Sequence, residues 1–422
     1  MEKKSQENQQ FEENLDGLRF VQFHFSDPTG GLHYMEESID NVPGILKSGV
    51  GVDGSSVIGF GQVEKSDIIL FPERSSFSRF VVEGEEIGMY WCHVLTPELE
   101  KHPNDPRNVL QLVIDKAAKM GFECEMFSEL EFYVLDEKTR KPVDNARYLS
   151  PPPLDKCSRL RYDFGHAYEK AGLKVKRIHH ELGPGQNEVE LQLTPVMKNC
   201  DDSMIAIWLA QLISSKYNWV VDFTPKPFPE IPGNGLHQHI RLKDIKTKEN
   251  VMAAKEGGLS KIALQFIAGM LKYSRDITAV FGNDPNTYDR LKPGYEAPIY
   301  ATWDYSNRSA LVRIPAIGKG DLSKTRVEFR GGDASGSIHL LCAMILAAGL
   351  KGIEENLECP KNTIGDVAHL TEQELKDLKI EILPTSLPES LKILEESKFI
   401  AEFIDPSLKT FMNQNGLQKM KK

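Results

Sequence analysis

The chain has 422 residues, 40% of them hydrophobic and 27% charged, which suits a globular protein with two domains or one large domain. Its formal net charge of −10 argues against nucleic acid as a partner, and no stretch approaches the roughly 18 apolar residues of a membrane span. The polar start has no signal-peptide core and the six cysteines lack metal or disulfide spacing, so we expect a cytoplasmic protein.

Short strands are predicted for the first hundred residues. Three stretches alternate as strands do: "LRFVQFHFSD" (18–27), "GLHYMEESI" (31–39) and "MYWCHVL" (89–95). The segment "HPNDPR" (102–107) is typical of a linker, and helical periodicity follows it up to Gly121. We therefore place a domain boundary at the linker and expect three parts: a polar segment at 1–14, a first domain at 15–103 and a second domain at 104–422.

Strands and helices alternate in the second half of the chain. Wide apolar faces predict helices at 201–217, 259–282 and 336–357. The last of these is rich enough in Ala and Leu to be largely buried.

Several predicted strands carry charged residues on one face. In "FSELEFYVL" (127–135), Glu129 and Glu131 are two residues apart and so project from the same side of an otherwise apolar strand. The same alternation places other charged residues together: Glu188 with Glu190, His237 with His239, and Glu328 with Arg326 and Arg330. Arg308 and Arg313 lie near a further strand.

These charged faces have two interpretations. Each segment alone is typical of the solvated side of an antiparallel sheet. As a set, faces made of Glu, His and Arg favour a binding site, because Glu and His bind cations such as Mg²⁺ or Mn²⁺ and Arg binds phosphate and carboxylate. A cation would also relieve the repulsion between adjacent carboxylates. The set predicts a curved sheet that holds divalent cations for ATP-dependent phosphoryl transfer. The sequence contains neither a P-loop nor the kinase motifs.

Seven ordered motifs resemble those of the type I glutamine synthetases of bacteria and archaea, over about residues 15 to 405. They are "VDGSS" (52–56), "FSELEF" (127–132), "HHELGPGQNEVE" (179–190), "GNGLHQH" (233–239), "RLKPGYEAP" (290–298), "NRSALVRIP" (307–315) and "RVEFR" (326–330). The resemblance implies an α+β fold with a small N-terminal β-grasp-like domain. It also implies a large α/β catalytic domain whose curved antiparallel sheet forms the active-site funnel.

The resemblance also implies an activity. It is the ATP-dependent ligation of ammonia to glutamate through γ-glutamyl phosphate, with two or more Mg²⁺ or Mn²⁺ ions per subunit. One cation would be held by Glu131, Glu181 and Glu188, and the other by Glu129, His237 and Glu328. The ATP-binding residues would be His239, Arg308, Arg313 and Arg326. The glutamate site would comprise Glu131, Gly233, Arg290 and Arg330. The residues implied in catalysis are Asp53, Glu296, Arg308 and Arg313, with Asp53 acting on ammonium across a subunit interface and Glu296 closing the site.

Two departures from the family pattern leave alternatives open. Pro232 stands where relatives carry an asparagine that contacts the substrate, and "GGDASGSIH" (331–339) replaces a proline-rich loop. The acceptor or the acid could therefore differ, giving a γ-glutamyl-amine ligase or a related ligase, and a non-catalytic relative is the third alternative. The resemblance also implies a homo-oligomer with active sites shared between neighbours in a hexameric ring. A stacked dodecamer is not favoured, because the sequence ends before the tail by which relatives join two rings.

Overall fold

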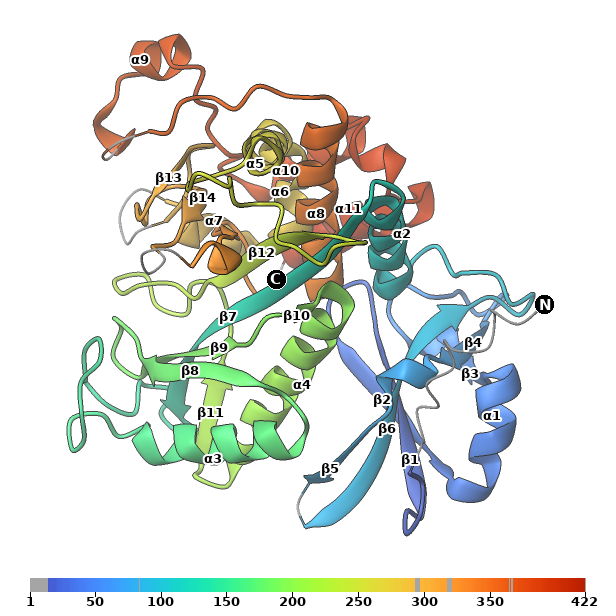
Figure 1. Cartoon of the computed structure of the whole chain (residues 1–422). Coiled ribbons are helices and arrows are strands. Elements are labelled where there is room, and N and C mark those ends of the chain that lie inside the picture. Colours follow the sequence, from blue (N-terminus) through green and yellow to red (C-terminus); the bar gives the residue numbers. More distant parts are fainter. Residues whose placement is uncertain are drawn as a thin grey trace.

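Two β-sheets organise the computed structural model, which describes residues 14–82, 84–292, 297–316, 321–363, 365 and 367–421 (Figure 1). The first sheet has six strands and the second has nine. Each sheet packs on buried apolar side chains, and β6 of the first sheet also contributes Met89 and Trp91 to the larger core of the second. The two sheets therefore share a packed boundary.

The first sheet holds one short helix against it. Its elements are β1 (Phe20–Ser26), β2 (Leu32–Ser38), α1 (Val42–Ser48), β3 (Val50–Asp53), β4 (Asp67–Pro72), β5 (Ser78–Val82) and β6 (Glu85–Leu95). The strand order is β2-β1-β6-β4-β3, with β5 also paired to β6, and β1 runs parallel to β6. Val21, Phe23 and Phe25 alternate into the core, which confirms the strand predicted at 18–27.

The second sheet has the long strand β7 at its centre, crossing the middle of Figure 1. Its strands are β7 (Phe122–Asp136), β8 (Val175–His180), β9 (Gln186–Leu191), β10 (Thr194–Pro195), β11 (Trp219–Asp222), β12 (Leu236–Asp244), β13 (Trp303–Tyr305), β14 (Val312–Ile314) and β15 (Val327–Phe329). The order is β13-β14-β15-β12-β7-β9-β8, and β10 and β11 also pair with β7. Every pairing is antiparallel except that of β13 with β14. The predicted antiparallel sheet is therefore present, with one parallel pair at its edge.

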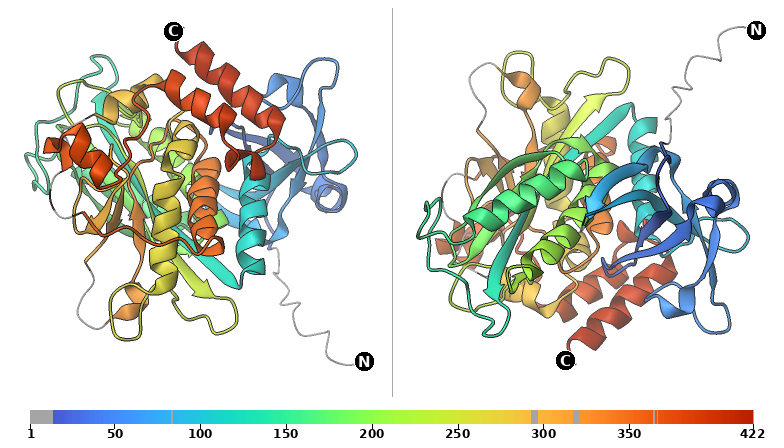
Figure 2. Two further views of the ribbon diagram at one scale, coloured as in Figure 1. Left: turned by 90° about the horizontal axis from the view of Figure 1, so that it is seen from above. Right: turned by 90° about the horizontal axis from the view of Figure 1, so that it is seen from below.

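Helices follow the first sheet along the chain, and several of them cover the apolar face of the second sheet. They are α2 (Pro106–Lys119), α3 (Ser158–Lys170), α4 (Val196–Ser215), α5 (Lys261–Lys272), α6 (Ser274–Phe281), α7 (Pro285–Arg290), α8 (Ile338–Glu354), α9 (Glu372–Asp377), α10 (Leu387–Glu396) and α11 (Pro406–Lys419). The short α9 lies apart from the sheet (Figure 1). Leu130 and Phe132 of β7 point into the same core as α3, α4 and α8. Helices α5 and α8 run side by side (Figure 2), and α8 is buried along nearly its whole length as predicted. None of the helices in the described ranges is long and apolar enough to cross a bilayer.

Two sequence predictions about the helices are wrong in part. The 102–107 segment is not a free linker, because Asp105 caps α2 and Arg107 lies inside that helix with no exposed surface. The single helix predicted at 259–282 is two helices that meet at Tyr273. The break lets α5 follow α8 while α6 packs on α10, and the Tyr273 ring stacks on Phe399 with centroids 4.2 Å apart.

Candidate active site

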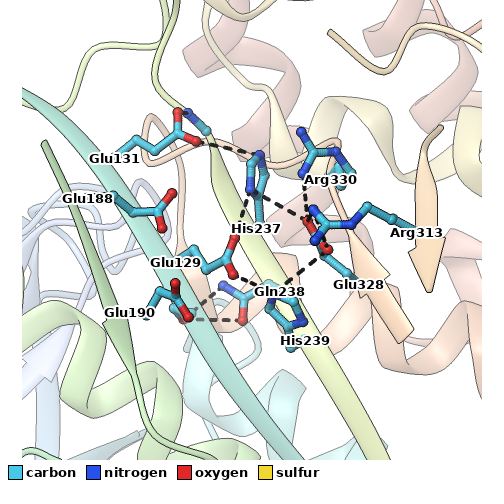
Figure 3. A network of polar contacts seen from close by, with 12 residues as sticks. Glu129, Glu131, Glu188, Glu190, His237, Gln238, His239, Arg313, Glu328 and Arg330 are labelled. Atoms are coloured by element: carbon cyan, nitrogen blue, oxygen red, sulfur yellow. Dashed lines mark hydrogen bonds and ion pairs between the residues drawn. The ribbon is translucent and has the colours of Figure 1, made fainter. Parts of the chain in front are cut away.

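The charged side chains predicted to share faces lie together on neighbouring strands of the second sheet (Figure 3). In the strand register, Glu129 of β7 pairs with Glu190 of β9 and with His237 of β12. Glu131 pairs with Glu188 of β9. Because alternate residues project from one side of a strand, these groups meet on the face opposite the apolar core. They line one cavity, and five arginines line it with them: Arg177, Arg290, Arg308, Arg313 and Arg330.

Glu129 is the centre of a first cluster of possible cation ligands. Its Oε1 lies 2.7 Å from His239 Nε2, and its Oε2 lies 3.2 Å from His237 Nδ1. Glu328 Oε1 lies 3.8 Å from His237 Nδ1. Burial opposes ionisation of Glu129, but His239 and His237 outweigh it and hold the pKa of this carboxyl well below its usual range. The structure brings together the predicted trio of Glu129, His237 and Glu328, and places His239 beside it.

A second cluster surrounds Glu188. His179 lies next to it, with Nε2 3.3 Å from Glu188 Oε1 and Nδ1 3.9 Å from Glu181 Oε1. Burial and repulsion from Glu129 and Glu131 raise the pKa of Glu188 well above its usual range. A cation bound beside Glu188 would offset this repulsion.

The residues of both clusters fit divalent cations. Carboxylate oxygens and imidazole nitrogens are the donor types that Mg²⁺ and Mn²⁺ accept in proteins. Ligand atoms of Glu129, His239 and Glu328 all lie within 4.8 Å of one another, as do those of a second trio, His179, Glu188 and Glu190. His179 Nδ1 is buried and makes no hydrogen bond within the part of the chain that the structure describes.

Arginines from the other end of the sheet face these carboxylates. Arg330 Nη1 donates to Glu328 Oε1 at 2.6 Å, and Arg313 Nη1 lies 3.1 Å from Glu328 Oε2. Arg330 Nε donates to the carbonyl of Arg308 at 3.1 Å, which fixes the guanidinium. Glu328 is the one charged residue within the three-residue strand β15, and Arg330 comes directly after the strand. This wall of the cavity is suited to anions.

The 331–336 loop, which departs from the family pattern, holds Arg290. Arg290 Nη2 donates to the carbonyls of Gly331 and Gly332, the latter at 2.9 Å, and its Nε lies 3.9 Å from Asp333 Oδ2. A Cβ on Gly233 would lie 2.8 Å from Arg290 Cγ, so only glycine fits there without displacing the arginine. The predicted pair of Gly233 and Arg290 is therefore in direct contact.

An aromatic and cationic group closes one end of the charged face. The Phe127 ring stacks on His239, with centroids 4.1 Å apart and planes inclined by 9°. Lys176 Nζ lies 4.2 Å from the centre of the Phe127 ring, and the Arg326 guanidinium lies 5.5 Å from it. Lys176 also forms an ion pair with the buried Glu190. Sequence reasoning missed Lys176 and gave Glu190 no role, although the alternation of Glu190 with Glu188 was a signal.

Not every predicted residue lines this cavity. His239 and Glu328 contact residues that line it, and Arg326 contacts His239, whereas Asp53 lies away from it. Asp53 ends β3 in the first sheet, is exposed, and accepts hydrogen bonds from Ser55 N–H at 2.9 Å and Ser56 Oγ at 2.7 Å. Hydrogen bonds from these serines lower its pKa. Glu296 lies outside the described residues. Tyr148, which the sequence did not single out, lines the cavity and meets the His179 ring edge-on at 5.6 Å.

The fold has two sheets, and the charged face of the second sheet carries carboxylates suited to binding cations beside arginines suited to binding anions. Family models described as "Glutamine synthetase, beta-Grasp domain" and "Glutamine synthetase, catalytic domain" match residues 17–97 and 103–416. The chain therefore belongs to the glutamine synthetase family, which confirms the family and the fold expected from its motifs.

Similar proteins cover nearly the whole chain. The glutamine synthetase of Thermotoga maritima is 34% identical over 397 residues, covering 92% of this chain and 89% of the relative. That of Thermococcus kodakarensis is 34% identical over 398 residues, covering 94% and 88%. Among solved structures, Plasmodium falciparum glutamine synthetase has a TM-score of 0.85 at 21% identity, covering 96% of this chain and 93% of the other. A complex named GmaS/ADP has a TM-score of 0.84 at 23% identity, covering 96% and 94%. At these identities, the structural matches show the fold alone.

Proposed function

We propose that this protein is a glutamate–ammonia ligase. The γ-carboxylate of glutamate takes the terminal phosphoryl group of ATP, releasing ADP, and ammonia then displaces phosphate from γ-glutamyl phosphate to give glutamine. Phosphorylation is needed because a free carboxylate is a poor electrophile. The observation that carries the proposal is the cavity that carboxylates and five arginines line together, in a chain that belongs to the glutamine synthetase family.

Two groups of residues would hold the divalent cations. We assign one cation to Glu131, Glu181 and Glu188 and the other to Glu129, His237 and Glu328. Bound Mg²⁺ or Mn²⁺ would supply charge neutralisation for the phosphates. The pairing of Glu131 with Glu188, the effect of Glu181 on the pKa of Glu188, and the contacts of His237 with Glu129 and Glu328 support the assignment.

The basic wall would bind the anionic groups of both substrates. We assign Arg308 and Arg313 to the transferring phosphoryl group, where fixed guanidiniums stabilise developing negative charge. His239 and Arg326, which flank Phe127, would bind the nucleotide. We assign the glutamate carboxylates to Arg290 and Arg330, with Glu131 and Gly233 completing that site.

Ammonium must bind and lose a proton before it attacks, so carboxylates are needed at its site. We assign that role to Asp53, supplied by a neighbouring subunit, because Asp53 is exposed and lies on the first sheet rather than at the cavity. The role of Glu296 in closing the site and excluding water also stays a prediction.

We also propose that the protein works in the cytoplasm as a homo-oligomeric ring whose neighbouring subunits share active sites.

A ligase for another amine or acid is the second candidate. Pro232 lines the cavity and has no side-chain donor or acceptor, while its carbonyl accepts a hydrogen bond from Tyr133 Oη at 2.6 Å. The substrate end next to Gly233 therefore has fewer polar contacts than an asparagine would give.

Phosphate release from ATP separates these candidates. The full chain would be assayed with Mg²⁺ and glutamate, with and without ammonium, beside a panel of small amines and alternative acids. Ammonium-dependent release with glutamate, together with glutamine as product, is the expected result. Release only with another amine or acid would support the second candidate. No release with any pair, while ATP still binds, would refute both and leave a non-catalytic relative.

A further inference from the structure

Asp144 lies behind the cavity and collects hydrogen bonds from three separate segments. Its Oδ1 accepts from the backbone N–H of Gly185 at 2.8 Å and of Ala146 at 3.2 Å, and its Oδ2 accepts from Lys156 N–H at 3.0 Å. His180 Nε2 lies 3.1 Å from Oδ1. The carboxylate is almost completely buried, so these contacts decide where the three segments lie.

One of these segments carries proposed cation ligands. The His180 ring reaches from Asp144 to the carbonyl of Glu181, with Nδ1 2.7 Å from that oxygen. Gly185 lies in the turn between Glu181 and Glu188, has a φ of +66°, and is anchored by its N–H to Asp144. Asp144 thus holds both sides of the turn that joins the two glutamates.

A second layer holds the same turn from the other side. Asn187 Nδ2 donates to the Gly185 carbonyl at 2.9 Å, and Arg161 Nη1 donates to Asn187 Oδ1 at 2.5 Å. Arg161 in turn pairs with the buried Asp155. Because backbone N–H groups and Arg161 already point at the carboxylates of Asp144 and Asp155, this cluster is a hydrogen-bonded support and not a cation site of its own.

The remaining contacts of Asp144 fix the loop that carries Tyr148. Ala146 and Lys156 lie towards the two ends of that loop, and Leu149 N–H donates to the His180 carbonyl at 3.1 Å. Two walls of the cavity, one with Tyr148 and one with Glu181, are therefore tied to one buried carboxylate.

We infer that Asp144 is a positioning residue that sets the placement of Glu181 relative to Glu188 and thereby the affinity of this cluster for a divalent cation. The inference rests on the proposed role of these glutamates in cation binding. Replacing a residue that hydrogen-bonds to metal ligands and orients them typically weakens metal binding by about 10–100-fold. An asparagine at 144 would turn one acceptor into an amide N–H₂ that faces the N–H of Lys156 or the other donors, so it cannot keep every contact.

The test is direct Mn²⁺ titration of the full-length protein by calorimetry or electron paramagnetic resonance, without nucleotide. Asp144→Asn should weaken binding at one site by about 10–100-fold. The matched control is Asp105→Asn, because Asp105 is also buried and accepts two backbone N–H groups, from Val94 and Arg107, but lies at the start of α2. The control should lower thermal stability and leave the Mn²⁺ affinity unchanged.

Unchanged Mn²⁺ affinity in Asp144→Asn, or an equal loss in both variants, would overturn the inference. Asp144→Glu, which keeps the charge and the acceptors on a longer stem, serves if the asparagine variant fails to fold, and should give a smaller loss of affinity. Glu181→Gln separates the two levels of the argument. If Glu181→Gln does not weaken Mn²⁺ binding, the cation assignment itself fails. If only Asp144→Asn is without effect, the positioning role alone fails.

Discussion

Replacing Arg107 by methionine tests the buried link between the two sheets. Arg107 has no exposed surface and forms ion pairs with Asp201 of α4 and with Glu73, which follows β4 of the first sheet. Its guanidinium also lies 5.4 Å from the centre of the Trp91 ring. Burial opposes the ionisation of Asp201, and Arg107 is the main group that offsets it and lowers the pKa of this carboxyl.

The expected cost follows from what the variant leaves behind. Removing one partner of a buried ion pair typically costs about 3–5 kcal/mol, because the other charge stays buried without compensation. His339 Nε2 lies 2.9 Å from Asp201 Oδ1 and would still support it. Methionine also fills much of the space of the arginine stem. We therefore expect Arg107→Met to decrease the free energy of unfolding by about 3 kcal/mol, the smaller end of this range.

Urea unfolding followed by tryptophan fluorescence measures this loss, at one fixed protein concentration because assembly changes apparent stability. Asp201→Asn in the same chain removes the uncompensated charge, so the double variant should lose about 1–2 kcal/mol less than the sum of the single variants. A loss below about 1 kcal/mol for Arg107→Met, or strictly additive losses, would refute the reasoning.

Three further outcomes are expected. Glu129→Gln should abolish one Mn²⁺ site and lower ATP-dependent phosphate release by about 100-fold or more; unchanged release and Mg²⁺ dependence would contradict the assignment. Asp53→Ala should raise the KM for ammonium by about 10-fold or more and leave thermal stability nearly unchanged, because the side chain is exposed; a normal ammonium KM would count against the shared site. Burial lowers the pKa of His24 from 6.5 to about 3, so the unfolded chain binds more protons between these values and acid destabilises the fold. On going from pH 7 to pH 5, the free energy of unfolding of His24→Asn should therefore fall by about 2 kcal/mol less than that of the unmodified protein, as measured by urea unfolding at each pH. The same dependence of the unfolding free energy on pH in both proteins would disprove this.

The alternation of polar and apolar residues was sufficient to predict the charged face of the second sheet. Glu129 and Glu131 project to one side of β7, as the structure shows, because side chains on a strand alternate with a period of two. This property belongs to the strand itself and does not depend on which strands lie beside it. The pattern could not identify the partners across strands. His179 and Lys176 come from an edge strand whose register is shifted by a bulge between Val175 and Arg177, and such shifts leave no periodic signal.

The buried polar links were also beyond the sequence pattern. Pro106 and Arg107 follow an Asn-Asp pair, which resembles a loop, yet the same residues begin a capped helix. Asp144 lies in a loop whose polar composition suggests solvent exposure. Whether such a side chain is buried depends on contacts with segments about 40 residues away, including Gly185.

The central place of β7 has a consequence for how the protein acquires its cation site. This strand of 15 residues pairs with β9, β10, β11 and β12. The carboxylates of the site span the chain from Glu129 on β7 to Glu328 on β15, which pairs with β12. Contacts between residues so distant in sequence form slowly, since each requires a long loop to close first. A chain in which β12 or β15 has not yet paired cannot bring these ligands together. The appearance of Mn²⁺ binding during refolding would thus mark the completion of this sheet, and it could be timed against the burial of tryptophan.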